Sequence, residues 1–159
     1  MKITILAVGK IRESFYREAI AEFQKRLSRY VKITIQETVD EKTPDHASER
    51  ENEKIRELEG ERLLKFLQTD AMVIALAIDG TMYDSLQLSE KIQKLGVSGV
   101  SHIIFVIGGS LGLSDAVLKR ADLRLSFSKM TFPHQLMRVI LLEQIYRSYR
   151  IMNHEPYHK

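Results

Sequence analysis

Three short runs of apolar, largely β-branched residues constrain the fold of this chain more than any other feature. They cover residues 3–8, 71–78 and 102–107. A strand that is apolar on both sides has to be covered on both sides, which is typical of the central strands of a parallel sheet. The three runs therefore predict the buried middle of such a sheet.

The segments between these runs have the periodicity of helices or of half-exposed strands. Alternation of apolar and polar residues predicts two further strands, at 31–37 and 122–127. Helical spacing predicts helices over 13–29, 48–67, 85–95, 114–120 and 133–152. We expect Ser48 to cap the second helix, with Glu51 in capping-box position, and Ser85 to cap the third. Asp79-Gly80 predicts a turn that ends the strand at 71–78.

Because strands and helices alternate, the chain is predicted to be an α/β protein with a mainly parallel sheet and helices on both faces. Its 159 residues suit one domain spanning 1–159. The absence of cysteine excludes disulfides, thiolate catalysis and cysteine-bound metals. His154 and His158 are four residues apart, but Pro156 interrupts the helix that would align them, so we expect no metal site.

The apolar run at 3–8 is too short for a signal peptide or a membrane span, and no later run reaches about 18 residues. We therefore expect a cytoplasmic protein without membrane contact. The net charge is +3, and eight Lys or Arg residues stand against three acids between Lys119 and Lys159. This C-terminal part is either a phosphate-facing surface or an ordinary solvated basic face.

Three loops follow predicted strands, at 76–80, 107–112 and 126–134, and ligands of open α/β sheets bind at such strand ends. Gly108-Gly109 would let a ligand approach the backbone, but a tight strand-to-helix turn is the better explanation when the pair is taken alone. The glycines match neither a Walker A loop nor the dinucleotide-binding fingerprint. In the third loop, the side chains of Phe127, Met130 and Phe132 either surround an aromatic ligand or simply cover the sheet.

The last predicted helix and the tail carry most of the remaining chemistry. Glu143 and Arg147 are four residues apart and can form an ion pair. The wide apolar face of this helix suits either a dimer interface or a fully buried core helix. The tail Tyr157-His158-Lys159 offers a ring that can stack on a base, an imidazole and a cation, but the last residues of a chain are also commonly frayed.

Several segments together resemble the ribosomal large subunit pseudouridine N3-methyltransferase H family, which belongs to the SPOUT class of methyltransferases. They are Met1-Lys-Ile with Ala7-Val-Gly-Lys10, the stretches 105–113 (FVIGGSLGL) and 125–135 (LSFSKMTFPHQ), the Arg138…Glu143-Gln-Ile-Tyr-Arg147 helix and the ending Pro156-Tyr-His-Lys159. The resemblance implies a deep C-terminal trefoil knot, an S-adenosylmethionine site and a homodimer. It also implies a substrate, a pseudouridine in a stem-loop of large-subunit (23S) rRNA on assembled ribosomes.

The resemblance assigns roles to particular residues of this chain. By position, the cofactor-binding residues are Leu76, Gly108, Phe127, Ser128, Lys129, Met130, Thr131 and Phe132. For catalysis we expect a cation, Arg138 or Lys159, to favour the anion of the imide, and Tyr157 to stack on the target base. The base is either His158, because an imidazole accepts protons near neutral pH, or Glu143 acting through water. In a dimer, the tail of one subunit would complete the cofactor pocket of the other.

Two other functions compete with this one. The chain could be a non-enzymatic ribosome-associated factor that uses only its basic C-terminal face, or a methyltransferase of the same class that acts on tRNA. The small size leaves no appended RNA-binding domain, and the net charge is modest. Such a protein gains affinity from a preassembled, shaped target, which favours the ribosome over free RNA.

Overall fold

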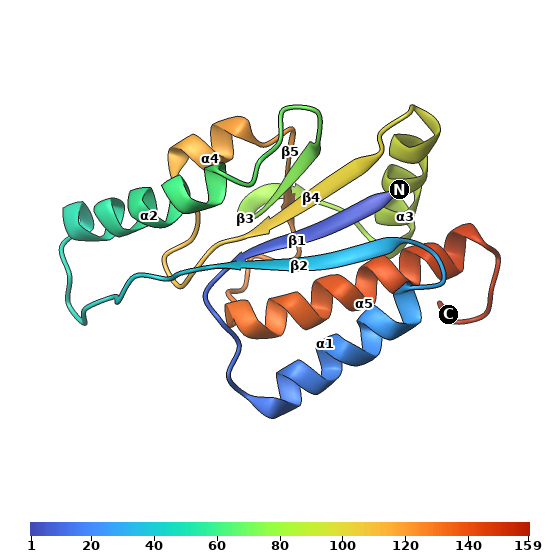
Figure 1. The fold of residues 1–159 in the computed structure, drawn as a ribbon, viewed down its shortest axis with the longest axis horizontal. Coiled ribbons are helices and arrows are strands. Elements are labelled where there is room, and N and C mark those ends of the chain that lie inside the picture. Colours follow the sequence, from blue (N-terminus) through green and yellow to red (C-terminus); the bar gives the residue numbers. More distant parts are fainter.

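The computed structural model describes all residues 1–159 and contains one five-stranded sheet with the order β2-β1-β4-β3-β5 (Figure 1). All four strand pairs are parallel. The apolar runs form the three central strands, as the sequence predicts, and the two alternating segments form the edges. The strands are β1 (Lys2–Val8), β2 (Lys32–Thr38), β3 (Met72–Met82), β4 (His102–Ile107) and β5 (Leu123–Ser126).

Five helices cover the two faces of the sheet, which confirms the predicted architecture (Figure 1). α1 and α5 lie side by side on one face with α3 packed against α5, and α2 packs with α4 on the other face. Each face has its own core, of 18 buried apolar residues on the α1–α5 side and nine on the α2–α4 side. The helices are α1 (Ser14–Leu27), α2 (Glu49–Leu64), α3 (Ser85–Val97), α4 (Asp115–Arg120) and α5 (His134–Met152).

The predicted turn at Asp79-Gly80 is wrong, because β3 continues to Met82. The ladder with β5 is interrupted between Leu76 and Thr81 and then resumes, as in a strand with a bulge. A Cβ at Gly80 would lie 2.7 Å from the backbone carbon and oxygen of Arg124. Only a glycine lets the irregular segment pass this close to β5, so the residue marks a close approach rather than a strand end.

Helix caps also differ in detail from the prediction. The cap of α3 is Asp84 rather than Ser85, and Asp84 and Gln87 form a complete capping box. Ser48 caps α2 as predicted and accepts from the Glu51 N–H over 3.1 Å. The Glu51 carboxylate accepts from the Ser48 hydroxyl instead of its backbone N–H, so the box at α2 is only half formed.

None of the helices combines the length and the apolar character needed to cross a membrane. The trefoil knot implied by the resemblance stays a prediction.

Candidate functional site

One cavity of about 600 Å³ opens beside the irregular segment of β3 and the ends of β4 and β5, and residues from all three segments predicted as loops line it. Seven of the eight expected cofactor-binding residues lie in its wall, and Lys129 is the exception. The lining residues are Leu76, Ala77, Ile78, Ile107, Gly108, Gly109, Ser110, Leu111, Gly112, Leu125, Phe127, Ser128, Met130, Thr131, Phe132, Pro133, His134 and Met137. The parallel sheet thus brings loops 50 residues apart in the sequence to one place.

The glycine loop after β4 folds back on itself beside this cavity. Gly109 and Gly112 form an isolated antiparallel bridge, and Gly112 has a φ of 84°. A Cβ at Gly108 would lie 2.8 Å from the backbone carbon of Gly112, so the loop closes this tightly only with glycine at position 108. The buried carboxylate of Glu59 in α2 supports the loop from behind, 3.1 Å from where a Cβ of Gly109 would be.

Most backbone N–H and C=O groups of the loop from 127 to 132 have no hydrogen-bond partner. No N–H or C=O group in this segment bonds to another backbone group. Two side-chain contacts shape it: the Ser126 hydroxyl donates to the Ser128 carbonyl oxygen over 3.1 Å, and the Met130 N–H donates to the Ser128 hydroxyl over 3.0 Å. The cavity therefore combines apolar side chains with unpaired backbone donors and acceptors, an arrangement that suits a flat ring with a polar edge.

Arg138 lies in the interior, not in the cavity wall. Its side chain is only 1% exposed and makes an ion pair with Glu37. Its Nη2 also donates to the carbonyl oxygen of Gly9 over 2.6 Å. The guanidinium thus links α5 to the ends of β1 and β2.

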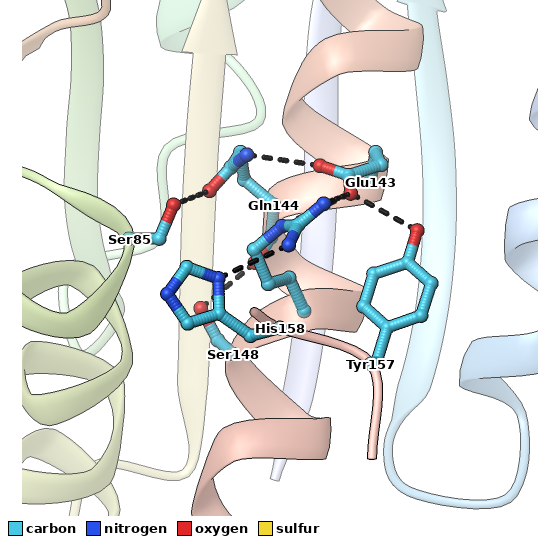
Figure 2. Close-up of polar contacts among 7 residues, drawn as sticks. Ser85, Glu143, Gln144, Ser148, Tyr157 and His158 are labelled. Atoms are coloured by element: carbon cyan, nitrogen blue, oxygen red, sulfur yellow. Dashed lines mark hydrogen bonds and ion pairs between the residues drawn. The ribbon is translucent and has the colours of Figure 1, made fainter.

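Glu143, Tyr157 and His158 form a second cluster, on α5 and the tail (Figure 2). Arg147 makes an ion pair with Glu143, as the spacing predicts, and donates over 3.0 Å to Nδ1 of His158. The Tyr157 hydroxyl donates to the Glu143 carboxylate over 3.0 Å, and Gln144 donates to the other oxygen of the same carboxylate over 2.9 Å. Both oxygens of the Glu143 carboxylate thus accept from donors of its own chain.

The tail is docked rather than frayed. Arg150 donates to the carbonyl oxygen of Pro156 over 2.8 Å. The Tyr157 ring meets Tyr146 edge-on at 4.9 Å between centroids, and the Arg147 guanidinium lies 4.7 Å from its centre. Burial and the hydrogen bond to Glu143 raise the pKa of Tyr157, which keeps the phenol protonated. None of these residues lines the cavity of its own chain.

α5 itself is a core helix. Leu141, Leu142 and Ile145 are fully buried against the sheet and its neighbours. The apolar face of α5 was predicted to be either a dimer interface or part of the core, and within this chain these residues belong to the core.

Two polar residues near the cavity stand outside the expected set of cofactor-binding and catalytic residues. The position of His134 beside Pro133 predicts either a helix start or a pocket wall, and the structure shows both, because His134 is the first residue of α5 and lies in the cavity wall. Nothing in the sequence indicates that Glu59 is buried, because it stands in a long charged segment and only tertiary packing buries it. No group of three or more His, Asp or Glu side chains is arranged to hold a metal ion.

Comparisons with known proteins agree on one class of enzyme. The family described as predicted SPOUT methyltransferase matches residues 1–158. The proteins named ribosomal RNA large subunit methyltransferase H from Bifidobacterium adolescentis and Clostridium tetani are 62% and 57% identical over 159 residues, which is the full length of both chains in each pair. Among solved structures, a putative methyltransferase from Legionella pneumophila with the bound cofactor SAM aligns with a TM-score of 0.51 at 10% identity, over 94% of this chain and 66% of that one.

Proposed function

The chain belongs to the SPOUT methyltransferase family, and on that premise we propose that it methylates N3 of a pseudouridine in large-subunit rRNA on assembled ribosomes, with S-adenosylmethionine as methyl donor. The observation that carries the proposal is full-length similarity to relatives named for large-subunit rRNA methylation, joined to a cavity at the strand ends. The family membership argues against a non-enzymatic ribosome factor, and the names of the relatives argue against tRNA as the substrate.

The cavity fits the proposed methyl donor. Its unpaired backbone groups at 127–132 match the polar edge of an adenine or a ribose, and Leu76, Phe127 and Phe132 supply apolar surface. We assign binding to these residues together with Gly108, Ser128, Met130 and Thr131, whereas Lys129 lies outside the wall. When bound, the donor supplies a methyl group whose carbon–sulfur bond breaks, with its electron pair left on sulfur, as the bond to N3 forms.

The residues of this chain have two tasks in that reaction. N3 belongs to a weakly acidic imide, so the protein has to favour loss of its proton and hold the ring in line with the methyl group. We propose Tyr157 for stacking on the target ring and His158 for accepting the proton. Glu143 already accepts from three side chains, so we assign it to holding the tail rather than to proton transfer.

His158 and Tyr157 do not line the cavity of their own chain, which supports a homodimer in which each tail serves the partner's pocket. In the docked tail, Nδ1 of His158 accepts a hydrogen bond from Arg147. The tail would therefore leave Arg147 when it reaches the partner. Two exposed apolar side chains at the cavity, Ile78 (52%) and Met130 (73%), provide surface for such an interface.

The direct test is incubation with labelled S-adenosylmethionine and ribosomes that lack the modification, followed by mapping of the methylated nucleotide. We expect one methylated pseudouridine in large-subunit rRNA, and no reaction on free tRNA. A methylated tRNA, or no product with any RNA, would contradict the proposal. A protein with this substrate works where ribosomes assemble, so we place it in the cytoplasm.

The tail has its own test, a chain truncated after Pro156. We expect it to bind S-adenosylmethionine weakly or not at all and to lose methylation. In a mixed dimer, the truncated chain would be paired with a full-length chain whose own pocket is blocked by substitution. The tail of the full-length chain would then complete the pocket of the truncated chain, so at most one site would work. Full activity of the truncated chain with unchanged cofactor affinity would show that the tail takes no part.

A further inference from the structure

His134 is the only side chain in the cavity wall that carries an acid–base group. The other seventeen lining residues are apolar, glycine, proline, serine or threonine. If a substrate group gains charge inside this cavity, His134 is the only ionisable side chain of the same chain that can contact it. We expected Arg138 and the tail to make such contacts, but neither lies in this wall.

The two ring nitrogens of His134 have different surroundings. Nδ1 is buried and has no hydrogen-bond partner, whereas Nε2 is not among the buried unpaired atoms and bonds to no group of the chain. A buried N–H without an acceptor costs more than a buried lone pair that is left alone. The proton of the neutral ring therefore belongs on Nε2, which is left as a free donor.

The surroundings also keep the ring uncharged. Burial lowers the pKa of His134, and the neighbouring Arg138 of α5 lowers it further. Asp40, between β2 and α2, and Glu13, before α1, act in the opposite direction but do not reverse the shift. At neutral pH the side chain is thus a neutral imidazole with one open N–H.

His134 lies where the 126–133 loop joins α5, and it reaches the part of the cavity next to β1. Its Cε1 lies against Gly9, 3.4 Å from where a Cβ of that residue would be, and Gly9 follows β1. The loop at 127–132 follows β5, and β4 and β3 lie between β1 and β5 in the sheet. The methyl donor's polar edges can bind the free backbone groups of residues 127–132, which leaves the imidazole of His134 for the second reactant.

We infer that His134 is a catalytic hydrogen-bond donor whose neutral Nε2–H binds an imide oxygen next to N3 of the target ring and stabilises the anion that attacks. This inference rests on the function proposed above. The N3–H bond breaks and the proton passes to the base, for which we propose His158. The charge left on the ring spreads onto its two carbonyl oxygens, one of which accepts from His134. The N3–carbon bond then forms as the carbon–sulfur bond breaks.

A donor and a base differ in what they tolerate at this position. Glutamine keeps an N–H near the place of Nε2 but takes up no proton, so His134→Gln preserves a donor and removes a base. With saturating S-adenosylmethionine and unmodified ribosomes, we expect His134→Ala to slow single-turnover methylation by about 100-fold, the usual effect of removing one such donor. His134→Gln should stay within about threefold of the natural protein. A matched control is His102→Gln, at the amino-terminal end of β4 and outside the cavity wall, which should leave the methylation rate unchanged.

Two readouts do not depend on turnover. Calorimetry should give the same S-adenosylmethionine affinity for both His134 variants as for the natural protein. Ring ¹⁵N spectra of the free protein should show a neutral His134 protonated on Nε2 at pH 7. The inference is overturned if His134→Gln is as slow as His134→Ala, if the variants lose cofactor affinity instead of rate, or if the ring is charged or protonated on Nδ1. Inactivity of the natural protein on ribosomes would instead contradict the proposed function, and the spectra would still decide the state of the ring.

Discussion

Nη1 of Arg138 lies 2.5 Å from Oε2 of Glu37, and this ion pair joins the edge strand β2 to α5. The arginine is buried, whereas the glutamate side chain is 36% exposed at the end of β2. The same guanidinium donates to the carbonyl oxygen of Gly9, so one side chain fixes two strand ends beneath the cavity. A residue expected to be a cation beside the substrate is, in this chain, a buried structural link.

Loss of Arg138 should therefore destabilise the fold. Removing one partner of a buried ion pair typically costs about 3–5 kcal/mol, and the partial exposure of Glu37 favours the lower end. We expect Arg138→Met to lower the free energy of unfolding by about 3 kcal/mol, measured by urea denaturation. The exposed Arg124, which makes no side-chain bond, is the control, and Arg124→Met should stay within about 0.5 kcal/mol. A change of that small size in Arg138→Met would show that the pair contributes little.

Two glycine substitutions should separate cofactor binding from stability. A Cβ at Gly108 meets the Gly112 backbone at 2.8 Å, so Gly108→Ala should displace the loop and weaken S-adenosylmethionine binding at least about tenfold. A Cβ at Gly96, in α3, meets only the end of Met1 at 3.5 Å. Gly96→Ala should thus stabilise the protein by about 0.5–1 kcal/mol and leave binding unchanged. Calorimetry and thermal unfolding of both variants give the answer, and equal binding by Gly108→Ala would contradict the proposed role of the loop.

The fold followed from local patterns because each central strand contains a nearly continuous apolar run. What local patterns could not supply is where the chain passes close to itself. Gly80 looked like a turn because Asp-Gly is a common turn dipeptide, yet the residue is needed for contact with β5. The register shift between Leu76 and Thr81 depends on that contact and leaves no periodic trace.

For the site, too, the sequence predicted the general location but not the close contacts. Strand ends of a parallel sheet meet, so the gathering of three loops around one cavity follows from topology. Burial of charged side chains does not, because Arg138 and Glu59 look in the sequence like the many exposed charges around them. Their surroundings come from residues about 100 and 18 positions away, Glu37 and Glu41.

The buried carboxylate of Glu59 should make stability depend on pH. Burial raises its pKa above the ordinary value of 4.5, while the Glu41 N–H that it accepts acts in the opposite direction. Between the ordinary pKa and the raised one, the folded state keeps a proton that the unfolded state has lost. The free energy of unfolding therefore falls as pH rises above about 4.5. Glu59→Gln keeps the acceptor oxygen and removes the titration. We expect the variant to gain stability relative to the natural protein between pH 4 and pH 7 in urea denaturation series, and a difference that is constant over this range would contradict the assignment.

Substitutions of Tyr157 should distinguish the two things this side chain offers, a ring and a hydroxyl. In the docked tail the hydroxyl donates to Glu143 over 3.0 Å, a bond worth about 1 kcal/mol. If the ring stacks on the target base, Tyr157→Phe keeps the stacking surface and Tyr157→Ala removes it. Stacking on one base is worth about 1–3 kcal/mol, so Tyr157→Ala should lower kcat/KM on ribosomes by about 5- to 150-fold, while Tyr157→Phe stays within about threefold. Tyr30→Phe is a control: it removes a partly buried hydroxyl that donates to Glu155 and accepts from Arg150, and it leaves the hydrogen bond between Tyr157 and Glu143 in place. Equal losses in Tyr157→Phe and Tyr157→Ala would show that the hydroxyl matters and the ring does not.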